Sequence, residues 1–367
     1  MATEQLKCKL AGQCGGCPSA LRDFAPEVKA AKVRNAFAAA ELRFVPSGRV
    51  RDRADLVWEV SGRQMRLGLY QIKSAASEVP RILDIDECPM MTEPLEAWLK
   101  VFRQKAPPIA HKGSVRLRVS PAGARGVWLD FANADVKTLF EEKSYLEWLS
   151  QQAFVEIGQR RKALTWRDGQ PKLVDPVLQP WFETYGAQGE PIPLYGPVGG
   201  FSQAGFAANR ALVTAVAELA EMSSEKNWLE LFSGNGNFAL ALAARGYDVE
   251  AFELDPLAVA GLNKSAEERG LTLKAGTLDV YLQAKKIPSF KDRALLVDPP
   301  RAGLREVLAQ MEHSELPRAI LYVSCFEESF LADSERLASL GFRAKSVLGV
   351  DQFPYSPHME WVALFQS

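Results

Sequence analysis

The stretch Trp228-Leu229-Glu230-Leu231-Phe232-Ser233-Gly234-Asn235-Gly236-Asn237 decides the fold. Its apolar run predicts a strand that ends in a glycine turn, and residues 238–245 then continue with a helical pattern. The two glycines would let a ligand approach the backbone closely. This pattern therefore predicts the first strand-loop-helix unit of a sheet that binds a nucleoside-containing cofactor.

Further strands and helices alternate after this unit. The other strand candidates are residues 248–253, 294–297 and 319–323, and the other helix candidates are residues 256–269 and 327–340. Such alternation is typical of a parallel sheet with crossover helices. We therefore expect a Rossmann-like α/β domain over residues 200–367.

The preceding residues follow a different pattern. We expect a helix over residues 26–42, with Val33 and Phe37 on one face, and antiparallel strands within residues 56–70 and 115–131. A second helix is expected over residues 135–152, then a turn at Asp168-Gly169 and connecting chain over residues 171–200. The expected organisation is a first segment over residues 1–92, a central α+β region over residues 93–199, and the cofactor domain over residues 200–367; the resemblance described below implies that the first segment binds a cluster and that it and the central region bind RNA.

The composition is that of an ordinary globular protein. The 367 residues are 47% hydrophobic and carry a formal net charge of −1. No apolar run approaches the roughly 18 residues that a membrane span needs, and the N-terminus lacks the apolar core of a signal peptide, so a cytoplasmic location is expected. Residues 1–73 hold 13 Lys and Arg against 7 Asp and Glu, which weakly favours a polyanionic partner.

Two segments narrow down the cofactor. Glu253 ends the next strand candidate, where a carboxylate can bind ribose hydroxyls. Gly234 and Gly236 also satisfy a loose dinucleotide pattern, so an NAD enzyme stays an alternative.

The segment Asp298-Pro299-Pro300-Arg301 follows a buried-looking strand and resembles the fourth motif of class I methyltransferases. Its alternative interpretation is a proline-rich turn. An aromatic residue usually follows the two prolines in amino-group methyltransferases, so Arg301 argues against adenine as the substrate.

Cys325 and Glu360 are the candidate reacting groups. Carbon-5 of uracil becomes nucleophilic when a thiolate adds to carbon-6, and a base must then remove the carbon-5 proton. Cys325 ends the strand candidate at residues 319–323, and Glu360 follows His358 in a segment where an apolar pocket would raise a carboxyl pKa. Each residue alone could equally be structural, as a buried cysteine or part of a loop.

The order and spacing of these segments resemble the RNA uracil-5-methyltransferase family. The resemblance rests on residues 298–303, on Tyr322-Val323-Ser324-Cys325 and on residues 353–360. It implies that Cys325 is the nucleophile and Glu360 the base. It also implies an S-adenosylmethionine pocket formed by Gln203, Phe232, Asn237, Glu253 and Asp298.

Four further cysteines lie apart from this site. Cys8, Cys14, Cys17 and Cys88 suit either tetrahedral zinc or a 4Fe-4S cluster. One branch of the resembled family has this spacing with a distant fourth cysteine before a proline, which implies a 4Fe-4S cluster with a structural or RNA-positioning role. Four unrelated free cysteines are the remaining alternative.

The implied substrate is a uridine in RNA. Because the chain begins almost at the cysteine cluster, it is similar to the shorter rRNA-modifying branch, which implies 23S rRNA, with tRNA as the closest alternative. A flipped uridine would need phosphate contacts, for which the candidates are Arg51, Arg53, Arg160 and Arg161. A non-catalytic iron-sulfur RNA-binding factor is a second alternative. No membrane and no obligate protein partner are expected.

Overall fold

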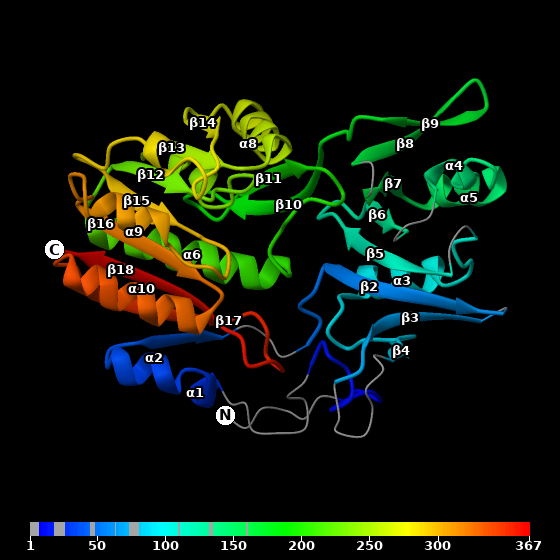
Figure 1. Ribbon diagram of the computed structural model, residues 1–367, viewed down its shortest axis with the longest axis horizontal. Helices are drawn as coiled ribbons and strands as arrows, with labels where there is room; N and C mark the ends of the chain where they lie inside the picture. Colours follow the sequence, from blue (N-terminus) through cyan, green and yellow to red (C-terminus); the bar gives the residue numbers. More distant parts are fainter. Residues whose placement is uncertain are drawn as a thin grey trace. The chain divides into compact units, whose positions relative to one another are not determined.

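The computed structural model describes residues 7–17, 26–44, 48–62, 64–72, 81–108, 111–131, 135–158 and 161–367. The chain forms two compact units (Figure 1). The first unit comprises residues 1–23, 46–181 and 197–205, and the second comprises residues 24–45, 182–196 and 206–367. This division differs from the consecutive ranges 1–92, 93–199 and 200–367, because residues 41–44 pair with a strand near the C-terminus.

An eight-stranded sheet forms the centre of the second unit. Its order is β1-β17-β18-β16-β15-β12-β13-β14, and every neighbouring pair is parallel except those of β18, which is antiparallel to both β16 and β17. The four predicted strands are confirmed as β12, β13, β15 and β16. The bounds are β1 Glu41–Phe44, β12 Asn227–Leu231, β13 Asp248–Glu253, β14 Lys274–Thr277, β15 Ala294–Val297, β16 Ala319–Ser324, β17 Arg343–Asp351 and β18 Glu360–Gln366.

Helices cover both faces of this sheet. Along β16, Ile320 and Tyr322 belong to one apolar cluster, whereas Leu321 and Val323 belong to another, as the alternation of a strand requires. A strand that is apolar on both faces is typical of a parallel sheet enclosed by helices. The helices are α1 Pro26–Lys29, α2 Ala31–Ala36, α6 Phe206–Ser223, α7 Ala239–Ala243, α8 Pro256–Arg269, η2 Ala284–Lys286, α9 Glu306–Met311 and α10 Glu327–Ser339.

The predicted helix at residues 26–42 was wrong. The helical residues stop at Ala36, because Phe37 has extended backbone angles, and Glu41–Phe44 form β1 instead. β1 pairs in parallel with β17, with Leu42 opposite Gly349. A local pattern cannot reveal a strand partner that lies about three hundred residues later in the chain.

The connecting chain expected at residues 171–200 was also wrong, because most of it forms strands. β9 Gln170–Val174 joins the sheet of the first unit, while β10 Gln179–Tyr185 and β11 Pro191–Gly196 form a separate two-stranded sheet. Proline lacks the N–H that a central strand donates, and an isolated pair of edge strands tolerates this loss.

The first unit contains a second eight-stranded sheet, of order β4-β3-β2-β5-β6-β7-β8-β9. The antiparallel strands expected at residues 56–70 and 115–131 are confirmed as β2-β3 and β5-β6. Asp168 and Gly169 both have positive φ, as expected for the tight turn between β8 and β9. The helix expected at residues 135–152 is divided into α4 and α5. The bounds are β2 Arg53–Ser61, β3 Gln64–Tyr70, β4 Ile82–Asp84, α3 Glu93–Phe102, β5 Lys112–Val119, β6 Arg125–Asp130, α4 Val136–Leu139, α5 Lys143–Gln152, β7 Phe154–Ile157 and β8 Lys162–Arg167.

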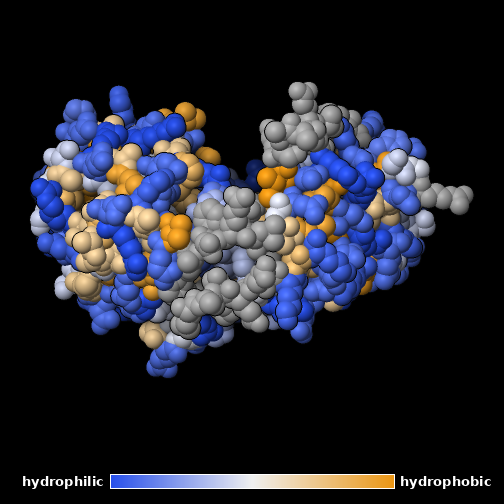
Figure 2. All heavy atoms as spheres, turned by 90° about the horizontal axis from the view of Figure 1, so that it is seen from below, coloured by the Kyte–Doolittle hydropathy of each residue, from blue (hydrophilic) through white to orange (hydrophobic). Residues whose placement is uncertain are grey.

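The visible surface of both units is mostly hydrophilic, with scattered hydrophobic residues (Figure 2). Singly exposed apolar residues are normal on a folded protein. Among the described residues, no helix combines the length and the apolar character that a membrane crossing requires.

Helix α8 packs closely against the backbone of β11 at Gly261. A Cβ atom at this position would lie 2.0 Å from the carbonyl oxygen of Tyr195. We expect Gly261→Ala to lower the free energy of unfolding by about 1–3 kcal/mol, because the helix has to move away from the strand. Urea denaturation measures this loss. The control is Ala260→Gly at an exposed neighbouring position, where only the helix-propensity difference of about 1 kcal/mol is expected. A smaller loss for Gly261→Ala than for the control would contradict this close packing.

Candidate active site

The two candidate reacting groups lie on neighbouring strands at one edge of the sheet. Cys325 directly follows β16, and Glu360 is the first residue of β18. Because these strands are antiparallel and Ser324 pairs with Trp361, the next positions in the register are Cys325 and Glu360. Asp298 directly follows β15, the other neighbour of β16, so it lies at the same edge. The structure thus brings together three of the residues predicted from sequence.

Glu360 is a buried carboxyl group with an amide partner. Its side chain is 4% exposed, and Gln352 Nε2 donates a hydrogen bond of 2.6 Å to Glu360 Oε1. Burial raises the pKa of Glu360 to about 7, although the hydrogen bond from Gln352 favours the ionised form. A carboxyl group with this pKa can accept a proton near neutrality. Gln352 had no signal in the sequence, because its role depends on the fold of the loop between β17 and β18.

Cys325 is half-buried among acidic groups. Burial, together with the charges of Glu360 and Asp298, raises the pKa of its thiol to about 11, against the positive charge of Arg301, which lowers it. The Arg301 guanidinium also lies 5.7 Å from the centre of the Phe326 ring. The thiol form is therefore favoured at neutral pH when no other positive charge is near.

Two further carboxyl groups belong to the same region, the half-buried Asp298 and the buried Glu230. The pKa of Asp298 is raised by burial, by Glu360 and by Glu253. The pKa of Glu230, on β12, is raised by burial, by Asp298 and by Glu253. Glu230 is fully buried, and its carboxyl oxygens have no partner meeting ordinary hydrogen-bond geometry. Such a set of acidic groups would favour a positively charged ligand. Glu230 was not singled out from the sequence because it lies inside an otherwise apolar strand.

Glu253 organises the glycine loop from the end of β13. Its carboxylate accepts hydrogen bonds from the backbone N–H of Gly234 at 2.9 Å and from that of Asp255 at 3.0 Å. Phe232 begins the loop with a φ of 65°, and its ring lies 5.4 Å from that of Tyr281. A bulky residue with positive φ is strained and is often found at functional sites. Both predicted residues thus lie at the loop where a cofactor was expected.

Asn237 lies at the end of this loop in an amide pair. Asn237 Nδ2 donates to Asn209 Oδ1 at 2.8 Å, and Asn209 Nδ2 donates to Asn237 Oδ1 at 2.9 Å. Thr184 also donates to the Asn237 carbonyl oxygen at 2.6 Å. The side chain is therefore held by a residue of α6, and the contact of Asn237 with a cofactor stays a prediction.

The remaining predicted residues belong to the first unit or lie outside the described residues. Gln203 is buried in the stretch 197–205, so its cofactor contact stays a prediction. Arg53 donates to the Ser202 carbonyl at 2.7 Å and pairs with Asp55 at 3.2 Å, which leaves it little capacity for a phosphate. Arg161 is described, with a φ of 48°, whereas Arg160 is among the residues that are not described.

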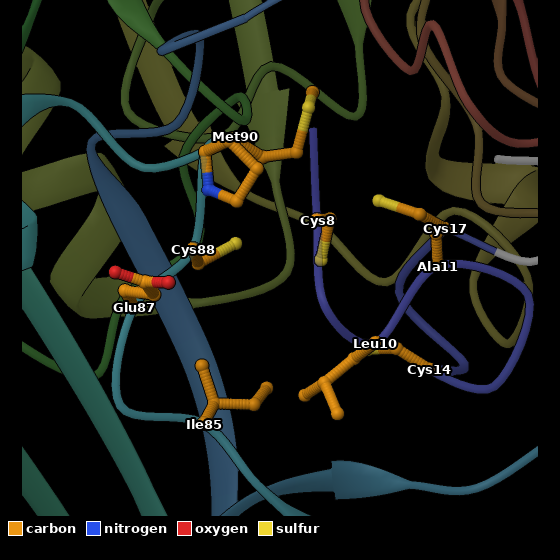
Figure 3. A pocket seen from close by; sticks show the side chains of 10 residues that line it. Cys8, Leu10, Ala11, Cys14, Cys17, Ile85, Glu87, Cys88 and Met90 are labelled. Atoms are coloured by element: carbon orange, nitrogen blue, oxygen red, sulfur yellow. The ribbon is translucent and has the colours of Figure 1, made fainter. Parts of the chain in front are cut away.

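The four other cysteines line one pocket of the first unit. Cys8, Cys14 and Cys17 come from the N-terminal loop, and Cys88 comes from the segment after β4. In Figure 3 the sulfur atoms of Cys17 and Cys88 point from opposite sides into the space beside Cys8. The backbone N–H of Gly15 donates to the Tyr70 carbonyl at 3.1 Å and so attaches the loop to β3.

Backbone N–H groups and one arginine surround these sulfur atoms. Burial raises the pKa of both Cys14 and Cys88. The backbone N–H groups of Gly16 and Cys17 lower the pKa of Cys14. Those of Met90 and Met91 lower the pKa of Cys88. Burial raises the pKa of Cys17 to about 12, against the positive charge of Arg51. In the described part of the chain, no group of three or more His, Cys, Asp or Glu is placed to hold a metal ion.

Three comparisons relate this chain to known proteins. Residues 194–367 match a family described as tRNA (Uracil-5-)-methyltransferase. The chain is 34% identical to the uncharacterized RNA methyltransferase Bd2056 of Bdellovibrio bacteriovorus, over 98% of this chain and 95% of that protein. It is 30% identical to the 23S rRNA (uracil(1939)-C(5))-methyltransferase RlmD of Shewanella sp. strain W3-18-1, over 87% of this chain and 69% of the relative.

A solved structure has the same fold. It is the tRNA (uracil-54, C5)-methyltransferase of Pyrococcus abyssi in complex with S-adenosyl-L-homocysteine, with a TM-score of 0.65 at 20% identity. The match covers 96% of this chain and 86% of that one. The predicted Rossmann-like α/β fold is thereby confirmed.

The acidic neighbours of Cys325 make a testable difference to its reactivity. We expect Glu360→Gln to speed alkylation of Cys325 by iodoacetamide severalfold at about pH 8, because it removes a negative charge that opposes the thiolate. Mass spectrometry of the Cys325 peptide measures the rate separately from the other cysteines. Glu335→Gln on the exposed side of α10 is the control. Equal rates in the two variants would contradict an electrostatic influence of Glu360 on Cys325.

Proposed function

The chain belongs to the RNA uracil-5-methyltransferase family, and from this premise we propose that it methylates a uridine through a covalent adduct with Cys325. The observation that carries the proposal is the register of β16 and β18, which places Cys325 and Glu360 at neighbouring positions. A nucleophile and a base are the two groups that methylation of carbon-5 requires. The methyl donor is S-adenosylmethionine, and the solved relative binds its demethylated product.

The proposed reaction uses Cys325 twice, to add to the ring and to leave it, and uses Glu360 once, to remove a proton. The Cys325 thiolate adds to carbon-6 of uracil, and the electron pair of the ring moves toward carbon-5 and the carbonyl oxygen. Carbon-5 then takes the methyl group from the sulfonium, which leaves as a neutral sulfide. Glu360 removes the carbon-5 proton, the carbon-5–carbon-6 double bond forms again, and the thiolate leaves.

The electrostatics of the site support this division of roles. A base with a pKa near 7 is matched to a reaction at neutral pH, and burial gives Glu360 that value. The acidic groups that oppose the Cys325 thiolate also favour binding of the cationic methyl donor. The sulfonium of the donor would add its positive charge to that of Arg301, and both charges favour the thiolate. Glu253, Phe232, Asn237 and Asp298 are the proposed cofactor residues in the second unit.

The proposed substrate is 23S rRNA in the cytoplasm. Relatives described as 23S rRNA (uracil(1939)-C(5))-methyltransferases match 87–96% of this chain at 28–30% identity, which supports ribosomal RNA. The family description and the solved relative both name tRNA, so tRNA is the alternative. Mapping 5-methyluridine in RNA from cells with and without the gene decides between the two.

Separate variants of the two reacting groups should stop the reaction at different points. Cys325→Ala is expected to lower the rate of methylation by at least about 10³-fold, because nothing then activates carbon-5. This variant should form no covalent adduct with RNA. In Glu360→Gln, Cys325 should still add to carbon-6 and carbon-5 should still receive the methyl group. A denaturation-resistant protein-RNA adduct should then accumulate, because no base removes the carbon-5 proton. Gel electrophoresis of labelled RNA under denaturing conditions measures both outcomes.

A 5-fluorouridine RNA provides the positive control, since fluorine cannot leave as a proton and the wild-type adduct should persist. Turnover by Glu360→Gln at the wild-type rate, or activity in Cys325→Ala, would show that the mechanism is wrong even though the family is right.

We further propose that the cysteine pocket holds a 4Fe-4S cluster with a structural or RNA-positioning role. Four thiols lining one largely apolar pocket, backbone N–H groups near two of the sulfurs and the charge of Arg51 suit an anionic cluster. Cys8, Cys14, Cys17 and Cys88 would be its ligands. A zinc ion held by the same four thiols is the less favoured alternative, because the spacing of the cysteines resembles that of the family branch with a 4Fe-4S cluster.

Metal analysis tests this assignment. Protein purified without oxygen should be brown and contain about four iron and four sulfide per chain. Cys17→Ser should lose most of the iron and destabilise the first unit, because metal binding is coupled to folding. Cys325→Ser is the matched control and should keep its iron. Stoichiometric zinc without visible absorbance would rule out the cluster.

A further inference from the structure

We propose that Lys29 positions the base Glu360, acting through the loop that carries Gln352. This inference rests on the proposed role of Glu360 and adds a residue from a distant part of the chain. Lys29 ends the four-residue helix α1, and its partner Asp351 lies 322 positions later. Both residues belong to the second unit.

The ammonium group of Lys29 holds the two residues on either side of Gln352. Lys29 Nζ lies 2.7 Å from Asp351 Oδ1, and it donates a second hydrogen bond of 2.9 Å to the Phe353 carbonyl oxygen. The two charged side chains are 0% and 4% exposed. A buried cation that binds both flanking residues restricts where the backbone of Gln352 can lie.

Gln352 connects the anchored loop to the carboxyl group of Glu360 by a hydrogen bond. Its side-chain amide donates the 2.6 Å hydrogen bond to Glu360 Oε1, and the residue itself is 1% exposed. A hydrogen bond donated to a carboxylate favours the ionised form, which is the form that accepts a proton. Displacement of Gln352 would therefore leave Glu360 with less carboxylate and a poorer orientation.

Among the described residues, the hydrogen bond from Gln352 is the contact that lowers the pKa of Glu360 against the effect of burial. Asp298 at the end of β15 and Cys325 at the end of β16 are acidic, so neither of them favours ionisation of the carboxyl. His358 lies on the same loop, where burial and the charge of Arg301 lower its pKa. The neutral imidazole is therefore the favoured form beside Glu360. The charge of Lys29 is balanced by that of Asp351. Lys29 therefore affects Glu360 by fixing the conformation of the loop and not by its own electrostatic field.

Without Lys29 the loop would lose its anchor. Asp351 would then be a buried carboxylate without its cation, a state that a protein relieves by moving the group toward water or by protonating it. Either change alters residues 351–353, which connect β17 to the turn before β18. An ion pair that served only stability would change unfolding without changing the proton-transfer step.

The test measures elimination separately from methyl transfer across about pH 6 to 9. Wild type and Lys29→Met react once with RNA, and denaturing gels follow formation and decay of the covalent adduct. In Lys29→Met the midpoint pH of adduct decay should rise by about one unit, so decay below pH 7 slows about tenfold, since one charge-assisted hydrogen bond is lost. The rate of methyl transfer should stay within about twofold of wild type.

A matched control lies on the same segment. Lys32 pairs with Glu327 at 2.9 Å, but its side chain is 67% exposed. Lys32→Met should leave the midpoint pH of adduct decay unchanged. Gln352→Leu should reproduce the shift, and combining it with Lys29→Met should add little, because both changes remove the same hydrogen bond.

A second variant separates positioning from folding. Lys29→Met with Asp351→Asn removes both buried charges with little change of shape, so the fold is retained more readily. Thermal unfolding and binding of S-adenosylhomocysteine establish that each variant is folded. If folded variants keep the wild-type midpoint pH, Lys29 has no positioning role. If wild-type protein forms no adduct with 5-fluorouridine RNA, the proposed function fails, and this inference fails with it.

Discussion

The antiparallel insertion of β18 between β16 and β17 determines where the two proposed reacting groups lie. In a purely parallel sheet, every strand that ends at the ligand edge offers only the residues that follow it. A reversed strand begins at that edge instead, so Glu360 and Cys325 become neighbours although 35 positions separate them in the sequence. The hydrogen-bond register of a central strand pair resists displacement, because slipping by one residue would turn its apolar side chains to the wrong face. The relative placement of the two groups is thus maintained by the most buried part of the sheet.

The second property of the site is its surplus of acidic groups. Glu230 and Glu360 are buried and Asp298 is half-buried, and loss of solvation raises the pKa of each. Burial of several carboxyl groups without cations is unfavourable, and proteins keep such arrangements at functional sites. A cationic ligand relieves the repulsion and a neutral one does not. The same field therefore opposes the Cys325 thiolate before the methyl donor binds and favours release of a neutral product afterwards.

The sequence predicted the local elements of the second unit well, because their signals are local. The apolar runs of β12, β15 and β16 and the glycines after β12 required no knowledge of distant residues. The failures share a cause. β1 was taken for helix because its partner β17 is remote, and β10 and β11 were taken for connecting chain because their prolines resemble a loop. The same limit explains why Gln352, Lys29 and Glu230 were missed: only the folded chain shows what their side chains contact. Cys325, Glu360 and the four cysteines were singled out because residue type and spacing, together with the family resemblance, suggest a chemistry for them, and their roles stay predictions.

The interleaving of the two units has a consequence for the order in which the chain folds during synthesis. All stretches of the first unit have been made once residue 205 leaves the ribosome, so its sheet can form and its cysteines can meet early. Residues 26–44 are made before the rest of the second unit, yet β1 and Lys29 do not meet their partners in β17 until about 300 further residues have been made. For most of that time, the apolar side chains of this segment remain without their sheet. The nascent chain therefore carries an early unpaired strand past a completed unit, a situation in which chaperone binding protects against wrong pairing.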